Sequence, residues 1–208
     1  MKKIVVIDYG MGNLHSVIKG IQKEKIPVIL SGKKSDIIKA CGIVIPGVGA
    51  FPDGMRELKK RKLDKIIINQ AKKGVPIMGI CLGMQLLFSE SLEFGRNKGL
   101  GLIPGKVIKF TTGLKVPHMG WNNCKIVKKS RLMYGFRDNS YFYFVHSYFC
   151  VPKDKKAVLT KTKYGNTIFT SAVESGNVSG FQFHPEKSGE KGLKIYKNFY
   201  ESCKNRET

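Results

Sequence analysis

The sequence lacks long apolar runs, paired cysteines and a recognisable leader. No stretch approaches the ~20 consecutive apolar residues of a membrane-spanning helix. The N-terminus shows no signal-peptide cleavage region, because Asp8 directly follows its short apolar run. Five cysteines occur without any C-x-x-C pair, which argues against a disulfide framework and against a zinc site. We therefore expect a soluble cytoplasmic protein without a metal site.

Acidic residues are also scarce. The chain has 15 Asp and Glu against 37 Lys and Arg, a net charge of +22. Such a charge is typical of nucleic-acid-binding proteins. The lysines are spread along the whole chain, however, and neither a basic tail nor a nucleic-acid-binding motif is present. We expect no nucleic-acid partner, and a lysine-rich surface that attracts anionic partners or phosphorylated substrates.

The length of 208 residues fits one domain spanning 1–208, without linkers or internal repeats. In the first half, short apolar runs alternate with helical segments. This alternation predicts an α/β fold with a parallel sheet covered by helices on both faces. The expected strands are 3–8, 26–30, 42–45 and 75–79.

After about residue 100 the pattern changes. Hairpin turn signals occur at Gly165-Asn166 and at Ser175-Gly176-Asn177. They indicate that antiparallel strands extend the sheet in the C-terminal half, followed by a helix over about 189–203. The expected strands are 106–110, 123–127, 141–146, 157–162, 167–173 and 178–183.

The segment Gly79-Ile80-Cys81-Leu82-Gly83 stands between an apolar run and a helical one. Small residues on both sides of Cys81 allow the tight strand-to-helix turn of a nucleophile elbow. A thiol at a helix N-terminus is favoured as the thiolate. The alternative is a buried structural cysteine in a glycine-rich turn, and this segment alone does not decide between the two.

Two glycine-rich turns follow other strands. The turn at Gly10 and Gly12 would suit a dinucleotide, but His15 stands where the third glycine is required, so no such cofactor is expected. The turn at 46–51 contains Gly47 and Gly49. Backbone amides at the carboxyl end of a parallel strand can stabilise an oxyanion, although a plain turn is the simpler interpretation.

His184 and Glu186 follow the last expected strand. A thiolate nucleophile needs an imidazole to move a proton, and the imidazole needs a carboxylate to orient it. Alone, His184 would be interpreted as a structural or surface histidine. Together with the elbow, Cys81, His184 and Glu186 form a candidate catalytic triad.

These motifs resemble the class I (triad) glutamine amidotransferases. The elbow and the His-Pro-Glu segment are shared across that family. The segments 116–122 and 143–148 are similar to one branch, whose members feed ammonia to a (β/α)8-barrel cyclase. Further matching segments are 7–14, 46–51 and 99–105.

The resemblance implies an open twisted sheet and hydrolysis of glutamine to glutamate and ammonia without a cofactor. Cys81 would attack the side-chain amide, His184 would act as base and then acid, and Glu186 would orient His184. The oxyanion would be met by the backbone amides of Leu82 and Gly49. Glutamine would be held by Gly47, Gln85, His146, Ser147 and Tyr148.

The same resemblance implies a heterodimer with the barrel cyclase. That partner makes imidazole glycerol phosphate and an aminoimidazole carboxamide ribotide in histidine biosynthesis. The residues expected at the interface or along the ammonia path are Asn13, Trp121, Asn122, Tyr143 and Lys187. Trp121 could instead belong to the core, and Lys187 could be one more solvated lysine.

Three alternatives remain open at this point. A related glutaminase could serve a different synthase, for example one that forms an amidino group on a sugar. A cysteine peptidase or a DJ-1-like protein could use a similar fold and elbow. A nucleic-acid-binding protein would show salt-dependent binding.

Overall fold

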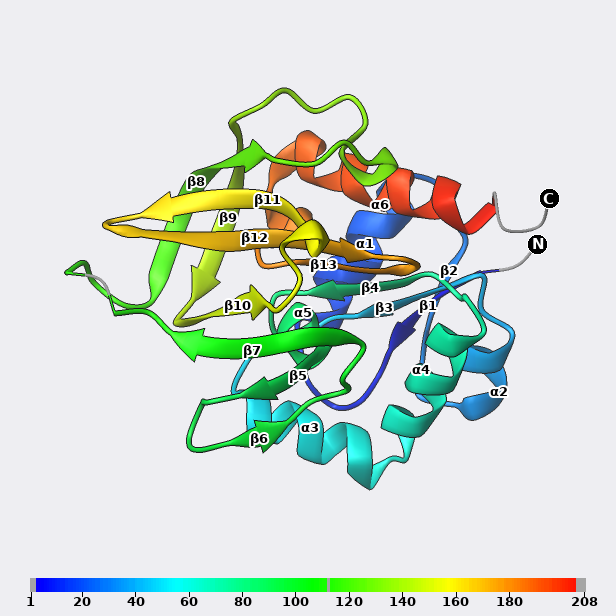
Figure 1. Ribbon diagram of the computed structural model, residues 1–208. Coiled ribbons are helices and arrows are strands. Elements are labelled where there is room, and N and C mark those ends of the chain that lie inside the picture. The colour runs from blue at the N-terminus through cyan, green and yellow to red at the C-terminus, as the bar shows by residue number, and fades with distance from the viewer. Residues whose placement is uncertain (1–2, 112, 205–208) are drawn as a thin grey trace.

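The computed structural model describes residues 3–111 and 113–204 (Figure 1). The first half alternates strands and helices as the sequence predicts. Its strands are β1 (Ile4–Ile7), β2 (Val28–Ser31), β3 (Gly42–Ile45) and β4 (Ile77–Ile80). Its helices are α1 (Leu14–Lys23), α2 (Lys34–Ile38), α3 (Phe51–Lys60), α4 (Leu63–Lys72) and α5 (Leu82–Leu86).

The parallel part of the sheet has the order β2-β1-β3-β4-β13, where β13 spans Val178–Phe181. Alternate residues of β1 face opposite sides, so Val5 and Ile7 pack against α2, α3 and α4, while Ile4 and Val6 pack against α1 and α6 (Gly189–Lys204). Apolar burial on both faces explains why these strands have continuous apolar sequences.

The second half extends the sheet through antiparallel strands, in the order β13-β12-β10-β7-β5-β6. In this extension β5 and β7 pair in parallel. A further layer branches from β12 through β11 to β8 and β9, seen at the left of Figure 1. The strands are β5 (Phe88–Ser91), β6 (Asn97–Lys98), β7 (Ile103–Lys109), β8 (His118–Ile126), β9 (Ser140–His146), β10 (Tyr148–Pro152), β11 (Val158–Tyr164) and β12 (Thr167–Ser175).

This arrangement confirms the expected fold class. Three short 3₁₀ turns complete the described elements: η1 (Arg131–Met133), η2 (Lys155–Ala157) and η3 (Pro185–Lys187). Among the described residues, no helix is both long and apolar enough to span a bilayer.

One helix is shorter than expected, three strands (β5, β6 and β10) were not expected, and β8 begins at His118 rather than at 123. The helical run after the elbow stops at Leu86, and the chain enters β5, because the Leu86 and Leu87 carbonyls accept hydrogen bonds from the 100–103 backbone instead of continuing the helix. β10 begins right after β9 at a bend. No turn residues next to β5 or β10 predict a strand at either place.

The sheet brings the carboxyl ends of β1, β3, β4 and β13 to one edge. β13 lies parallel to β4, with Phe181 opposite Ile80. Residues that follow these two strands are therefore neighbours although about 100 positions separate them in sequence. Open α/β sheets hold their ligands at such an edge.

Candidate active site

Cys81 occupies a strained corner between β4 and α5. Its backbone has φ 53° and ψ −110°, a conformation that is costly for a residue with a side chain. A Cβ at Gly83 would collide with the Ile45 carbonyl, and one at Gly79 with the backbone of Gly83. The expected elbow is thus present. Its helix is only five residues long, so local amides rather than a long helix dipole face the thiol.

His184 and Glu186 form a buried pair beside β13. The His184 Nδ1 lies 2.8 Å from Glu186 Oε1, and both side chains are almost completely buried. The Tyr196 hydroxyl donates to the other carboxylate oxygen over 3.4 Å. Glu186 is therefore held from two sides, which fixes the ring of His184 with its Nδ1 toward the carboxylate.

The other ring nitrogen of His184 is available for chemistry. Among the described residues, Nε2 is the one buried side-chain nitrogen or oxygen without a hydrogen-bond partner of ordinary geometry. Burial alone would lower the pKa of His184. The neighbouring Cys81 thiol and the Glu186 carboxylate outweigh it and raise the pKa to about 10. Near neutral pH His184 is therefore protonated, so that it can form an imidazolium–thiolate pair with Cys81.

Two further groups contact the Cys81 sulfur. The Gln182 side-chain amide donates to Sγ over 3.7 Å, and the thiol points to the Val145 carbonyl at 3.8 Å. An amide donor stabilises a thiolate. Sequence reasoning missed Gln182, and its position two residues before His184 was the available signal.

A cavity of about 350 Å³ opens in front of Cys81. That volume is at the lower end of the ~300–1,000 Å³ usual for small-molecule sites. Most of the predicted site residues line it: Gly49, Cys81, Leu82, Gln85, His146, Ser147 and Tyr148. The remaining lining residues are Val48, Glu93, Pro117 and Val145.

Gly47 is placed differently from the other predicted glutamine contacts. It does not line the cavity, because it packs behind the wall, where a Cβ would approach the Tyr9 hydroxyl at 2.6 Å and Leu82 Cβ at 3.0 Å. That hydroxyl donates to the Pro46 carbonyl over 2.7 Å and anchors the turn. Gly49 then has φ +103°, which only glycine adopts without strain.

Glu93 is a second residue that sequence reasoning missed. It lies in the connection from β5 to β6, outside any motif. Its buried carboxylate accepts a hydrogen bond from the Phe51 amide over 2.7 Å. Burial raises the pKa of Glu93, and burial together with the charge of Glu93 raises the pKa of Tyr148 on the same cavity wall. The cavity therefore holds one acidic group.

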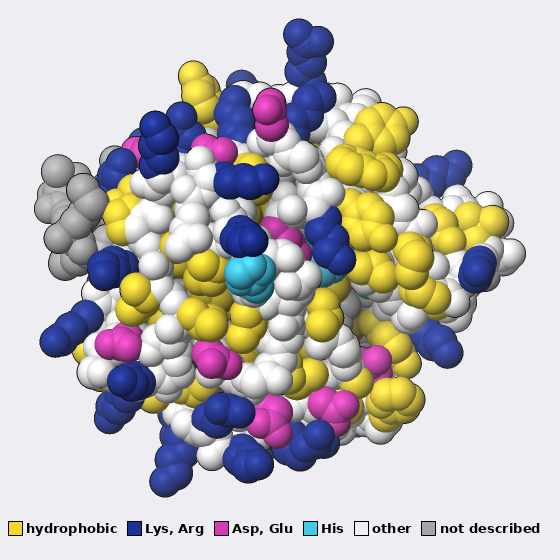
Figure 2. Space-filling view, turned by 180° about the vertical axis from the view of Figure 1, so that it is seen from behind, with side chains coloured by type: hydrophobic (Ala, Val, Ile, Leu, Met, Phe, Trp, Pro, Cys, Tyr) yellow, Lys and Arg dark blue, Asp and Glu magenta, His cyan; other side chains and the backbone are white. Residues whose placement is uncertain are grey.

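Three of the predicted interface residues, Trp121, Tyr143 and Lys187, lie together outside the cavity. Trp121 is 56% exposed, so it is not a core residue. Its ring meets that of Tyr143 at 6.3 Å, and Lys187 Nζ lies 5.8 Å from the Tyr143 ring. Exposed Met119 adds to the apolar surface of β8, and Figure 2 shows hydrophobic side chains gathered on that side.

Asn13 and Asn122 have structural partners. Asn13 is exposed and caps α1, with its side-chain oxygen accepting from the Ser16 amide. Asn122 is half-buried and hydrogen-bonded to His118 and to the Lys163 backbone.

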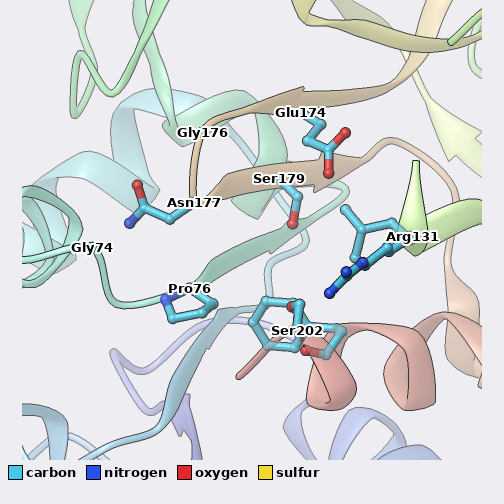
Figure 3. A pocket seen from close by; sticks show the side chains of 10 residues that line it. Gly74, Pro76, Arg131, Glu174, Gly176, Asn177, Ser179 and Ser202 are labelled. Carbon is cyan, nitrogen blue, oxygen red and sulfur yellow. Dashed lines mark hydrogen bonds between the residues drawn. The ribbon is translucent and has the colours of Figure 1, made fainter. Parts of the chain in front are cut away.

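A second cavity of about 390 Å³ lies at the opposite edge of the sheet, beside Pro76, Asn177 and Ser179 (Figure 3). The Asn177 amide donates to the carbonyls of Ala71 and Val75. The Glu174 carboxylate is paired with Lys128 and Ser130. In the described part of the chain no cluster of three or more His, Cys, Asp or Glu residues could hold a metal ion.

Comparison with known proteins agrees with this geometry. Residues 5–203 match the family "Glutamine amidotransferase class-I". The chain belongs to that family. Relatives within this amidotransferase family include the "Imidazole glycerol phosphate synthase subunit HisH" of Aquifex aeolicus, 48% identical over 198 residues that cover 95% of each chain. The protein of the same description from Methanosarcina acetivorans is 49% identical and covers 98% of this chain and 100% of its own.

Solved structures of amidotransferases share the fold. A crystal structure of a glutamine amidotransferase has a TM-score of 0.76 at 17% identity, covering 96% of this chain and 98% of its own. The structure of PurLQS from Thermotoga maritima has a TM-score of 0.76 at 21% identity, covering 97% and 99%. These structures confirm the expected fold, and the family assignment rests on the family match and on the relatives of 48% and 49% identity.

Proposed function

We propose that this chain is the glutaminase subunit of an imidazole glycerol phosphate synthase. It hydrolyses glutamine and passes the ammonia to a (β/α)8-barrel cyclase in the cytoplasm, as part of histidine biosynthesis. The observation that carries the proposal is the strained Cys81, which lines a small cavity and has the buried, unpartnered His184 Nε2 behind it. The relatives named HisH support the choice of synthase.

The triad divides the chemistry into two half-reactions. Cys81 Sγ attacks the side-chain amide carbon of glutamine, and the imidazolium of His184 protonates the departing ammonia. A glutamyl thioester remains on Cys81. His184 then removes a proton from water, which attacks the thioester and releases glutamate and the thiolate. Glu186 keeps Nδ1 protonated throughout, so that Nε2 performs both transfers.

The oxyanion is stabilised by backbone groups of two elements. The Leu82 amide begins α5 and so has no acceptor within that helix. Gly49 lines the same cavity from the 46–49 turn. Each such donor contributes roughly 10²–10³-fold to acyl transfer. Glycine at 49 allows the peptide to turn its N–H toward the cavity when substrate arrives.

The acidic and amide groups of the cavity select the substrate. Glutamine carries an α-ammonium, for which the carboxylate of Glu93 is the complementary group. Gln85 uses both hydrogens of its amide nitrogen within the protein, on the Tyr148 carbonyl and on Gln182 Oε1. Its own Oε1 is left to accept from a ligand. These groups favour an amino acid over a neutral amide.

The exposed surface of Trp121, Tyr143 and Lys187 is proposed to dock the cyclase. Aromatic anchors and a cation over a ring are typical of protein interfaces. Ammonia that escapes is wasted, so glutamine hydrolysis should be active only in the complex. We expect the isolated chain to release glutamate barely or not at all.

The test measures glutamate release by the chain alone, with the cyclase subunit, and with the cyclase subunit plus its ribotide ligand. We expect turnover to rise by orders of magnitude in the last case. Trp121→Ala or Lys187→Ala should weaken assembly or coupling. Tyr134→Ala is the control, because Tyr134 is 77% exposed and lies next to η1, outside this surface. Full turnover by the isolated chain would refute the coupling.

The same experiment distinguishes this proposal from the alternative in which the chain serves a different synthase. If the cyclase of histidine biosynthesis neither binds nor activates the chain, while another synthase does, the glutaminase chemistry stands and the pathway is wrong. If glutamine is untouched with every synthase and peptides are cleaved instead, the amidotransferase assignment itself fails.

A further inference from the structure

A continuous chain of hydrogen bonds runs from β8 to the cavity wall. Asn122 Nδ2 lies 3.2 Å from His118 Nε2, and His118 Nδ1 lies 3.1 Å from His146 Nε2. His146 Nδ1 lies 2.8 Å from the Tyr148 carbonyl. Both histidines are buried, with 3% and 6% of their surface exposed. The chain thus connects the strand that carries Trp121 with the wall of the glutamine cavity.

The direction of every bond in this chain follows from the backbone groups at its ends. A carbonyl only accepts, so the Tyr148 oxygen requires a proton on His146 Nδ1. In neutral His146 the other nitrogen is then an acceptor, and His118 must donate from Nδ1. His118 Nε2 in turn accepts from Asn122.

The orientation of the Asn122 amide is fixed independently. Its oxygen accepts from the Asn123 backbone N–H over 2.8 Å, and its nitrogen donates to the Lys163 carbonyl over 2.9 Å. A backbone N–H can only donate and a carbonyl can only accept, so the amide cannot be reversed. Asn122 therefore presents an N–H to His118, as the chain requires.

A second chain reaches the Tyr148 carbonyl from the catalytic side. Gln85 Nε2 donates to that carbonyl over 3.0 Å and to Gln182 Oε1 over 3.2 Å. The Gln182 amide nitrogen is thereby turned to Cys81 Sγ. Both lone pairs of the Tyr148 carbonyl are used, one by each chain. This carbonyl is the point where the two chains join, and it has no capacity left for the substrate.

We propose that His118 and Asn122 are positioning residues of the glutaminase, which orient the nucleophile Cys81 through His146, the Tyr148 carbonyl and the amides of Gln85 and Gln182. The proposal rests on the proposed function. It also assigns a route for control by the partner, because Asn122 follows exposed Trp121 on β8. Movement of β8 on docking would change the support of the Tyr148 carbonyl and hence the amide that faces the thiolate.

The hydrogen-bond chain keeps this direction only while both histidines are neutral, and the groups around the two rings keep them neutral. His118 is enclosed by the rings of Phe110, Phe144 and Phe169 and by two titratable groups, His146 from β9 and Tyr164 from β11. Burial lowers the pKa of His118 to about 4.

For His146, burial, His118 and His184 lower the pKa to about 3, against the hydrogen bond to Tyr148. Both histidines of the wild-type protein therefore stay neutral between pH 5.5 and 8.5, and the hydrogen-bond chain stays intact over that range.

The first experiment reverses one bond with a near-isosteric change, Asn122→Asp. A carboxylate at 122 only accepts, so neutral His118 places its proton on Nε2 and has none on Nδ1. The lone pair of His118 Nδ1 then faces the lone pair of His146 Nε2, and the hydrogen bond between the two rings is lost. Protonated His118 can donate to both neighbours and restores the chain. A neighbouring carboxylate raises a histidine pKa by roughly one to three pH units. The defect should therefore appear as pH rises.

The matched control is Asn123→Asp. Asn123 is the next residue on β8, and its side chain bonds to Asn139 rather than to a histidine. For each variant in complex with the cyclase, kcat/KM for glutamine is divided by the wild-type value at the same pH. We expect the Asn122→Asp ratio to fall roughly tenfold to hundredfold between pH 5.5 and pH 8.5, the cost of a small misplacement of reacting groups. The Asn123→Asp ratio should stay flat.

Asn122→Asp also loses the hydrogen bond to the Lys163 carbonyl. That loss lowers the kcat/KM ratio by the same factor at both pH values, so it does not contribute to the change of the ratio with pH. Co-elution of each variant with the cyclase on a size-exclusion column checks that the complex is assembled, and synthesis from added ammonium checks that the cyclase in it is active. A flat ratio for Asn122→Asp in an assembled complex would overturn the proposal. A wild-type complex that releases no glutamate would instead refute the proposed function.

A second measurement needs neither activity nor a variant. The chain contains four histidines, so 15N-labelled histidine gives a spectrum that can be assigned. We expect His118 and His146 to be neutral and protonated on Nδ1 near pH 7, the less common tautomer of free histidine. A proton on Nε2 of either ring would contradict the direction of the chain and overturn the proposal.

Discussion

The two cavities at opposite edges of the sheet are nearly equal in volume, about 350 and 390 Å³, yet they differ in chemistry. The one at the carboxyl edge contains Cys81 in a strained conformation and, behind it, a buried imidazole nitrogen without a partner. Glu174 and Asn177 line the cavity at the amino edge (Figure 3). The Glu174 carboxylate and the Asn177 amide already have partners within the protein.

This difference shows that volume alone does not identify a site. Backbone strain and an unsatisfied buried polar atom each cost on the order of 1–3 kcal/mol, and a fold retains them where they are used. Fully paired groups cost little and serve stability. Equivalent substitutions at the two edges should therefore change glutaminase activity to very different extents.

The largest effect is expected for Cys81→Ala. It removes the nucleophile, so glutamine-dependent synthesis by the complex should fall by roughly 10⁴–10⁶-fold, whereas synthesis from added ammonium should continue. Product formation is measured with each nitrogen source. Cys41→Ala, at the start of β3 and remote from the catalytic edge, is the control and should retain both activities. Loss of both activities in an assembled Cys81→Ala complex would contradict the division of labour.

A carboxylate exchanged for an amide at each edge gives the sharpest comparison. Glu186→Gln should lower glutaminase kcat by roughly 10²–10⁴-fold, because His184 loses its orienting charge. The same loss lowers the pKa of His184, which its neighbours hold at about 10. Glu174→Gln should leave kcat unchanged. Equal losses in the two variants would mean that Glu186 only stabilises the fold.

Cysteine labelling tests selectivity within one chain. A glutamine-like diazoketone should label Cys81 and spare the other four thiols. Burial raises the pKa of Cys124 to about 11 and raises the pKa of Cys150, and a bond to Cys41 together with burial raises the pKa of Cys203. Those thiols are poor nucleophiles. A peptide map by mass spectrometry gives the sites, and equal labelling of several cysteines would refute a special activation of Cys81.

The smallest effect concerns stability at acid pH. The pKa values of His118 and His146 are lowered to about 4 and about 3 in the folded state, so the unfolded chain binds more protons below pH 6.5. Stability should therefore fall as pH decreases from 6.5 toward 4. His118→Phe should reduce this fall by up to about 2 kcal/mol between pH 6.5 and 4.5.

Urea denaturation at the two pH values measures that difference, with exposed His15→Phe as control. His184 contributes in the opposite direction. Its pKa is raised, so its contribution is complete below pH 6.5 and is lost as pH rises through about 10. A His118→Phe variant with the same acid dependence as the wild type would show that His118 is not neutral in the fold.

The sequence predicted those parts of the fold that are determined locally. The strand Gly42–Ile45 was predicted with its observed bounds, and the helix expected over about 189–203 is observed as Gly189–Lys204, because short apolar runs and glycine punctuation mark them. The two-residue β6 was missed, and so were two longer strands, β10 and β5. Both are stabilised by pairing with β7, a partner that no local pattern reveals.

The candidate site divides in the same way. Cys81, His184 and Glu186 stand in motifs, so sequence identified them as candidates. Glu93 and Tyr196 stand in none. Tyr196 reaches Glu186 only because α6 packs beside η3, and Glu93 reaches the cavity only because its loop folds back to the Phe51 amide. Contacts of this kind depend on tertiary packing, which the order of residues does not display.

β13 has a consequence for how the protein is made. It is the last strand along the chain, yet it lies between β4 and β12, in the middle of the sheet. While a ribosome is still adding the residues before Val178, the parallel and antiparallel halves lack the strand that joins them. The Cys81 elbow then lacks His184, which follows β13. A nascent chain therefore carries no competent glutaminase, and activity appears only once the finished sheet closes around its final strand.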